Sequence, residues 1–156
     1  MNFKGVFLST ALTLAPPALA QSMLSGIVTD VHDGDTLTVR LTMGDTARVR
    51  LSWIDAPELK QPDGPWAQQT LAALVNQREV LIDKAGIDRY GRWLGVVYLN
   101  VNAALVQQGA AWVYRSYPHP ATLETLETAA QQQRLGVFTA DHPCPPWRYR
   151  RRQCGK

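Results

Sequence analysis

Residues 28–58 contain the stretch that decides the fold, with VTDVHDGDTLTVR at 28–40 and RVRLSWIDAPE at 48–58. Apolar and polar residues alternate through both segments, which is the pattern of strands in a half-buried antiparallel sheet. The intervening TMGD at 42–45 supplies the glycine and aspartate that a hairpin turn needs. We therefore predict three antiparallel strands between Gly26 and Trp53.

Two carboxylates lie at the ends of these predicted strands, Asp35 and Asp55. Val49, Leu51 and Trp53 alternate along the third strand, so Arg50 is predicted to point away from the apolar core. Acidic and guanidinium groups brought together in this way favour a hard metal ion and a phosphate.

Further along the chain, the pattern alternates between helices and strands. It predicts a helix from Gly64 to about Asn76, strands at 80–82 and 93–99, a helix at 102–108 with Asn102 as its N-cap, an extended piece at 111–114, and a helix from Pro120 closed by Gly136. Prolines after residue 142 argue against further regular structure. The expected fold is α+β, an OB-fold five-stranded β-barrel with three helices.

The first 20 residues have the composition of a secretory signal peptide. Lys4 is followed by a mostly apolar run and by the small-residue cleavage site ALA at 18–20. The alternative, a buried N-terminal helix, is disfavoured by the Pro16–Pro17 pair. We expect a secreted or periplasmic protein without membrane attachment after cleavage, with a domain at 21–140 and a basic tail at 141–156.

The tail carries both cysteines and most of the excess positive charge. In an exported chain, Cys144 and Cys154 are expected to form a disulfide. The formal net charge is +3, and residues 148–156 contribute five basic residues and no acid. Residues 21–147 carry ten basic and thirteen acidic residues. The tail is therefore either an attractor of polyanions such as nucleic acid or a solubilising end.

Four motifs in the same order make the sequence resemble the thermonuclease family, the calcium-dependent staphylococcal nuclease type. They are DGDT at 33–36, VRLSWIDAPE at 49–58, DRYGR at 88–92 and NAALVQQG at 102–109. The resemblance covers about residues 25–138 and implies the OB-fold barrel with three helices.

The resemblance also implies a role for each matching residue. The catalytic residues would be Arg50, Glu58 and Arg92; the Ca²⁺ ligands would be Asp35, Asp55 and the carbonyl of Ala56; and the substrate contacts would be Tyr90 and Tyr117. The type member has threonine where this chain has Ala56, so only a main-chain carbonyl is retained there. Asp33 would lie near the ion without binding it directly.

The expected function is a calcium-dependent nuclease that hydrolyses DNA and RNA with little sequence preference and leaves 3′-phosphate products, acting as a monomer. One alternative is a non-catalytic OB-fold module that binds single-stranded nucleic acid. Another is an exported calcium-binding or adhesive domain. Neither alternative requires the full set of three acids and two arginines. Carboxylates alone do not exclude magnesium or manganese.

Overall fold

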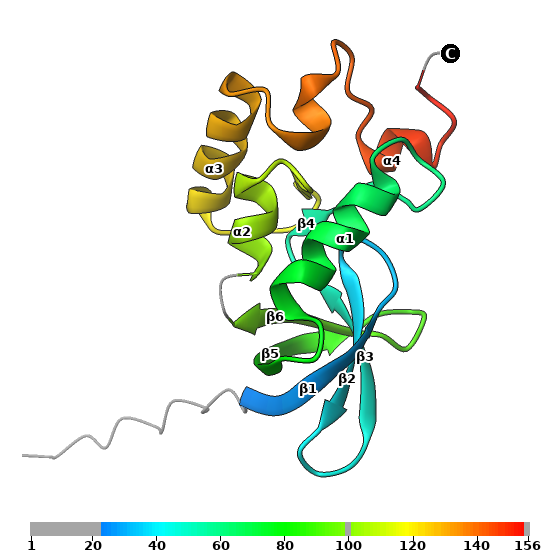
Figure 1. Ribbon diagram of the computed structural model, residues 1–156, viewed down its shortest axis with the longest axis vertical. Helices are drawn as coiled ribbons and strands as arrows, with labels where there is room; N and C mark the ends of the chain where they lie inside the picture. Colours follow the sequence, from blue (N-terminus) through cyan, green and yellow to red (C-terminus); the bar gives the residue numbers. More distant parts are fainter. Residues whose placement is uncertain (1–22, 99–100, 155–156) are drawn as a thin grey trace, which may run out of the picture.

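The computed structural model describes residues 23–98 and 101–154 (Figure 1). The predicted signal peptide at 1–20 lies outside these residues. Within the described part, no helix is long and apolar enough to cross a membrane.

Five strands form a closed barrel in the order β1-β2-β3-β6-β5. Their bounds are Met23–Val31 (β1), Thr36–Leu41 (β2), Thr46–Leu51 (β3), Glu79–Ile87 (β5) and Trp93–Tyr98 (β6). The β3–β6 pair is parallel, and the other four neighbouring pairs are antiparallel. The barrel confirms the expected five-stranded α+β architecture.

Alternate residues of these strands fill the barrel. Fully buried side chains include Val28, Leu37, Val49, Ile82 and Val97. This alternation is the property of strands that face a core on one side. Arg50 follows Val49 and precedes Leu51, so it lies on the opposite side of β3, as the alternation predicts.

Helices gather at one end of the barrel (Figure 1). They are α1 (Gly64–Val75), α2 (Val101–Gln107), α3 (Ala121–Gln132), a 3₁₀ turn η1 (Gly136–Thr139) and α4 (Pro146–Tyr149). Helix α2 contacts α1, α3 and β6, so it joins the helical layer to the barrel. A separate two-stranded sheet pairs β4 (Ile54–Asp55) with β7 (Trp112–Val113).

The third strand is shorter than predicted. It ends at Leu51, and Trp53 has a left-handed backbone with φ 67°. The carbonyl of Trp53 accepts the N–H of Tyr114 at 2.9 Å, at the point where the chain leaves the barrel to pair with β7. Alternation continued through Trp53, but pairing with a distant strand redirects the backbone here.

Asn102 was predicted to be an N-cap and is instead a buried residue inside α2. Its side-chain amide donates to the carbonyl of Ser52, which ties α2 to the end of β3. A long-range hydrogen bond therefore uses the amide that the sequence pattern assigned to a local cap.

Two helix boundaries near the C-terminus also differ from the prediction. Helix α3 ends at Gln132, because Arg134 adopts a left-handed backbone with φ 51°, and Gly136 begins η1. The proline-rich tail is not irregular throughout. Pro146 opens the short helix α4, since proline suits the first turn of a helix.

Candidate active site

The turn between β1 and β2 holds Asp35 against the end of β3. The Asp35 N–H donates to Asp33 Oδ1 at 3.0 Å, and the Asp35 carbonyl accepts the N–H of Leu51 at 2.8 Å. Its side chain is buried, and Oδ2 accepts the N–H of Ala56 at 2.8 Å. Two of these contacts therefore fix the backbone of Asp35, and the third fixes its carboxylate.

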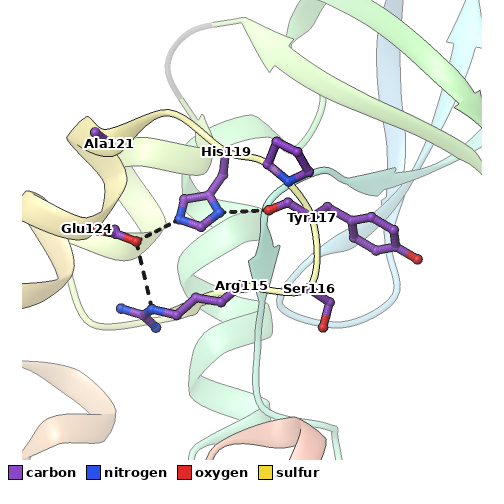
Figure 2. Close-up of a pocket in the computed structure, with 7 residues that line it drawn as sticks. Arg115, Ser116, Tyr117, His119, Ala121 and Glu124 are labelled. Atoms are coloured by element: carbon purple, nitrogen blue, oxygen red, sulfur yellow. Dashed lines mark hydrogen bonds and ion pairs between the residues drawn. The ribbon is translucent and has the colours of Figure 1, made fainter.

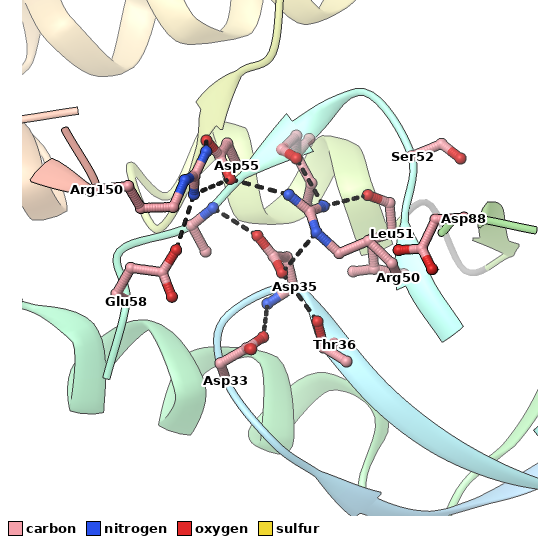
Figure 3. Close-up of polar contacts among 12 residues, drawn as sticks. Asp33, Asp35, Thr36, Arg50, Leu51, Ser52, Asp55, Glu58, Asp88 and Arg150 are labelled. Atoms are coloured by element: carbon pink, nitrogen blue, oxygen red, sulfur yellow. Dashed lines mark hydrogen bonds and ion pairs between the residues drawn. The ribbon is translucent and has the colours of Figure 1, made fainter. Parts of the chain in front are cut away.

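Arg50 joins the two buried aspartates (Figure 3). Its Nε lies 3.1 Å from Asp35 Oδ1, and NH2 donates to Asp55 Oδ1 at 2.9 Å. Its NH1 donates to the carbonyls of Leu51 at 2.6 Å and Ile54 at 2.8 Å. These contacts hold the planar guanidinium in one orientation between the two carboxylates.

The buried position of Asp35 is unfavourable for a negative charge. Burial raises the pKa of Asp35 to about 7, Arg50 opposes this, and the charges of Asp33 and Asp55 add to the rise. Burial therefore favours the neutral form of Asp35 despite the neighbouring Arg50 guanidinium. A small divalent cation with oxygen ligands would stabilise the ionised form, so the donor set fits such an ion.

The ligands available within the protein are few. No group of three or more His, Cys, Asp or Glu side chains with metal-binding geometry is present among residues 23–98 and 101–154. A cation bound by Asp35 and Asp55 would therefore take further oxygens from a main-chain carbonyl such as that of Ala56, from water, or from a substrate phosphate.

Glu58 lies beside Asp55 and contacts an arginine from the far end of the chain. Arg150 donates from NH1 to Glu58 Oε1 at 2.8 Å and to Asp55 Oδ1 at 3.1 Å, and from NH2 to Asp55 Oδ2 at 2.8 Å (Figure 3). The hydrogen bonds to Asp55 raise the pKa of Arg150, although burial opposes the shift. Arg150 therefore remains a cation in this position.

Arg92 is oriented by Asp88, four residues before it. Its Nε donates to Asp88 Oδ2 at 2.8 Å, while NH1 reaches the hydroxyl of Thr36 only at 3.4 Å. Burial tends to raise the pKa of Asp88, but hydrogen bonds from the backbone and side chain of Arg92 outweigh it, and the pKa is lowered. Asp88 is thus a stable anionic support for the guanidinium.

A single cavity of about 930 Å³ brings together all eight residues predicted to be catalytic, to bind the ion or to contact the substrate. They are Asp35, Arg50, Asp55, Ala56, Glu58, Tyr90, Arg92 and Tyr117. Tyr90 and Tyr117 are largely exposed, with relative accessibilities of 66% and 67%. Tyr90 lies near Arg92, whose guanidinium carbon is 5.5 Å from the ring centroid. The phenol rings therefore border the cavity, and the charged groups line its interior.

In the loop before α3, the imidazole of His119 contacts the main chain of Tyr117 (Figure 2). Nδ1 of His119 lies 2.9 Å from the Tyr117 carbonyl, and Nε2 lies 3.0 Å from Glu124 Oε1. Both ring nitrogens face acceptors, so both must carry a proton to satisfy these contacts. The carbonyl of Tyr117 and, next, the carboxylate of Glu124 raise the pKa of His119.

We expect this shift to be measurable by NMR titration. The His119 imidazole should titrate above its ordinary pKa of 6.5, and Glu124→Gln should lower the value. Because the pKa of His119 is higher in the folded state, protonation of His119 contributes to the free energy of unfolding below pH 6.5. This contribution is lost as the pH rises through the pKa of the folded state. A value at or below the ordinary one would contradict the contact with Glu124.

Gly34 allows the Asp35 turn to approach α1. A Cβ at this position would lie 2.5 Å from the Cβ of Ala56 and 2.8 Å from that of Ala67. We expect Gly34→Ala to lower the free energy of unfolding by about 1–3 kcal/mol, measured by chemical denaturation. Gly86→Ala is the control, because a Cβ there would meet nothing within 4 Å. Equal losses in the two variants would contradict the close approach at Gly34.

Comparison with known proteins identifies the family. Residues 48–140 match the family described as "Staphylococcal nuclease homologue". The chain belongs to this staphylococcal nuclease family. Micrococcal nuclease of Shigella flexneri is 40% identical over 162 residues, which cover 95% of this chain and 91% of that protein.

Two further relatives of this family member come from Escherichia coli. Protein ParB is 43% identical, covering 90% of this chain and 85% of that protein. An uncharacterized endonuclease of strain O157:H7 is 41% identical, covering 83% of this chain and 87% of that protein. The family and its relatives identify the chain as a nuclease that acts on nucleic acid.

Sequence reasoning did not identify Arg150 as a site residue. It interpreted Arg150 as one of several tail arginines, together with Arg148, Arg151 and Arg152. The structure gives Arg150 three hydrogen bonds to Asp55 and Glu58, whereas no side-chain hydrogen bond or ion pair is recorded for the other three in the described part of the chain. The available signal in the sequence was the position of Arg150 between the two cysteines of the expected disulfide. The other three arginines lie between the same cysteines, so this position does not show which arginine faces the site.

Proposed function

We propose that this nuclease is an exported, calcium-dependent endonuclease that hydrolyses DNA and RNA with little sequence preference and leaves 3′-phosphate ends. The observation that carries the proposal is the convergence of both aspartates, Glu58, Arg50 and Arg92 on one cavity. The likeness to micrococcal nuclease over nearly the whole chain supports it. The predicted signal peptide supports export.

Asp35 and Asp55 would hold the cation, with the carbonyl of Ala56 as a further oxygen. When bound, the ion would supply positive charge to a substrate phosphate and make a nearby water more acidic. The raised pKa of Asp35, caused mainly by burial, is consistent with a carboxylate whose ionised form a bound cation would stabilise.

Glu58 is proposed to accept a proton from the attacking water. Its side chain is 40% exposed and borders the cavity, so it is accessible to water and substrate. Proton acceptance by a positioned carboxylate is an established form of general base catalysis. Loss of the proton makes the water oxygen a better nucleophile towards phosphorus.

Arg50 and Arg92 would stabilise the negative charge that develops on the phosphate oxygens during attack. Both guanidinium groups are oriented before substrate arrives, Arg50 by backbone carbonyls and aspartates and Arg92 by Asp88. Charges that need no reorganisation at the moment of reaction stabilise a transition state most effectively. Tyr90 and Tyr117 would contact the substrate at the edge of the cavity.

The test is hydrolysis of denatured DNA and of RNA by the purified protein with calcium, with magnesium and with a chelator. Cleavage that requires calcium and leaves 3′-phosphate ends is the expected result. A binding module without catalysis is the alternative, because barrels of this type also bind single strands. Tight binding without cleavage under any of the three conditions would support that alternative and contradict the proposal.

The exposed tail arginines are expected to assist substrate capture. Replacing Arg148, Arg151 and Arg152 together by glutamine should raise KM mainly at low salt and flatten the salt dependence of binding. The triple variant retains Arg150 and both cysteines, so the contacts of the tail with the site remain. An unchanged KM at every ionic strength would contradict a role in capture and identify the tail as a solubilising end.

A further inference from the structure

Arg150 occupies the space between the two carboxylates to which different roles are assigned. It bonds both oxygens of Asp55, which is 1% exposed, and one oxygen of Glu58. For Asp55 Oδ2 and for the Glu58 carboxylate, Arg150 is the hydrogen-bond donor recorded within the described part of the chain. A residue 95 positions away in sequence from Asp55 thus places a positive charge between these two carboxylates.

The tail is fastened to the loop that carries Glu58. The side-chain oxygen of Gln61 accepts a hydrogen bond from the N–H of Glu58 at 3.3 Å, and the side-chain amide of Gln61 donates to the carbonyl of Cys144. The hydroxyl of Tyr149 donates to the Lys60 carbonyl at 2.8 Å. Cys144 and Cys154 form a disulfide, with Cα atoms 5.9 Å apart, around the segment that contains Arg150. The guanidinium is therefore kept at a high local concentration next to Asp55.

The two arginines on Asp55 differ in how firmly they are held. Arg50 is nearly buried and is bonded to two main-chain carbonyls in addition to the aspartates. Arg150 is 42% exposed, and the contacts recorded for its guanidinium are with carboxylates alone. It also borders a second cavity, of about 1170 Å³, next to the first. Arg150 can therefore leave Asp55 by side-chain rotation, whereas Arg50 cannot without breaking backbone contacts.

We propose that Arg150 is a tethered placeholder for the divalent cation, which must displace it from Asp55 and Glu58, so that Arg150 sets the cation concentration that the nuclease requires. The inference rests on the proposed function, because it assigns the same carboxylates to the ion. A guanidinium and a divalent cation cannot both have full access to Asp55 Oδ2. Displacement also frees Glu58 for its proposed task with water.

The experiment is a calorimetric titration of the purified protein with calcium alone, without nucleic acid. Arg150→Gln should bind calcium about tenfold more tightly than the unmodified protein, since charged hydrogen bonds to Asp55 no longer compete. Arg151→Gln is the matched control, because it removes the same charge from the adjacent, exposed position. Its affinity should differ by no more than about twofold from that of the unmodified protein, as expected for a screened surface charge.

A second measurement does not depend on the calorimetric signal. Adding calcium should raise the melting temperature of Arg150→Gln more than that of the unmodified protein, because tighter binding stabilises the folded state more. If the glutamine variant does not fold, Arg150→Lys takes its place in both measurements. An ammonium lacks the planar fork, so this variant should also bind calcium more tightly.

Several results would overturn the inference. Equal or weaker calcium binding by the Arg150 variants would show that the arginine does not compete with the ion, while calcium-dependent cleavage by the unmodified protein would leave the proposed function intact. An equal gain in Arg151→Gln would show a general charge effect. If none of the proteins binds calcium, both the inference and the calcium requirement of the proposed function are wrong.

Discussion

Glu58→Gln is expected to cleave denatured DNA at least about a hundredfold more slowly than the unmodified protein. Glutamine has almost the same size and keeps a hydrogen-bond acceptor for Arg150, so the loop and the tail should remain in place. It cannot accept a proton from water at neutral pH. The loss should therefore appear in kcat, measured under saturating calcium and substrate.

Binding measurements separate this role from a structural one. Calcium and DNA affinities of Glu58→Gln should stay within about threefold of those of the unmodified protein. The reason is that the two aspartates and the two arginines, Arg50 and Arg92, are unchanged. Glu79→Gln is the matched control, since Glu79 is an exposed residue of β5 that is not among the residues lining the cavity. Full activity of Glu58→Gln would refute the assigned role of the carboxylate.

Arg92→Ala is expected to lower kcat by about 10²–10³-fold. The alanine variant removes a preoriented cation from a cavity where phosphate charge develops, while Asp88 is left exposed to solvent. Single-turnover kinetics with saturating substrate measures this loss. Arg92→Lys should restore little of it, because an ammonium keeps the charge but not the planar fork that two phosphate oxygens can share.

The neighbouring residue Arg89 provides the control for charge alone. Arg89 is exposed, and its guanidinium lies 4.8 Å from the Tyr90 ring centroid and bonds the phenol oxygen, whereas the ion pair recorded for Asp88 in the described residues is with Arg92. Arg89→Ala should therefore affect substrate affinity slightly and kcat little. A defect in Arg92→Ala that is confined to KM would show that Arg92 binds the ground state and does not stabilise the transition state.

The strand and helix assignments show where local patterns succeed. Alternation through residues 28–51 correctly predicted the three strands β1, β2 and β3, although β1 begins earlier, at Met23, and β3 ends earlier, at Leu51. It succeeded because each residue in a strand reports directly whether it faces the core. The start of α1 at Gly64 followed from Pro65, whose geometry suits a first turn. Trp53 and Asn102 were misassigned, since the backbone at one and the amide of the other are determined by partners distant in sequence.

From the sequence alone, the strand pattern predicts the barrel, and the family resemblance identifies five charged residues of its cavity, Asp35, Arg50, Asp55, Glu58 and Arg92. Strand periodicity and motif spacing are local properties, and the turn at 33–36 and the segment at 49–58 carry most of the site within thirty residues. The signal peptide and the cellular destination are predicted from the sequence alone and remain predictions.

The placement of Arg150 and the support of Tyr117 by His119 emerge only in the folded chain. Arg150 and Asp55 are separated by 95 residues, and four tail arginines are equivalent by composition. The docking of the tail on residues 58–61 selects one of them, because Gln61, Tyr149 and the disulfide together fix the direction of α4. Long-range geometry of this kind has no local periodicity from which it can be predicted.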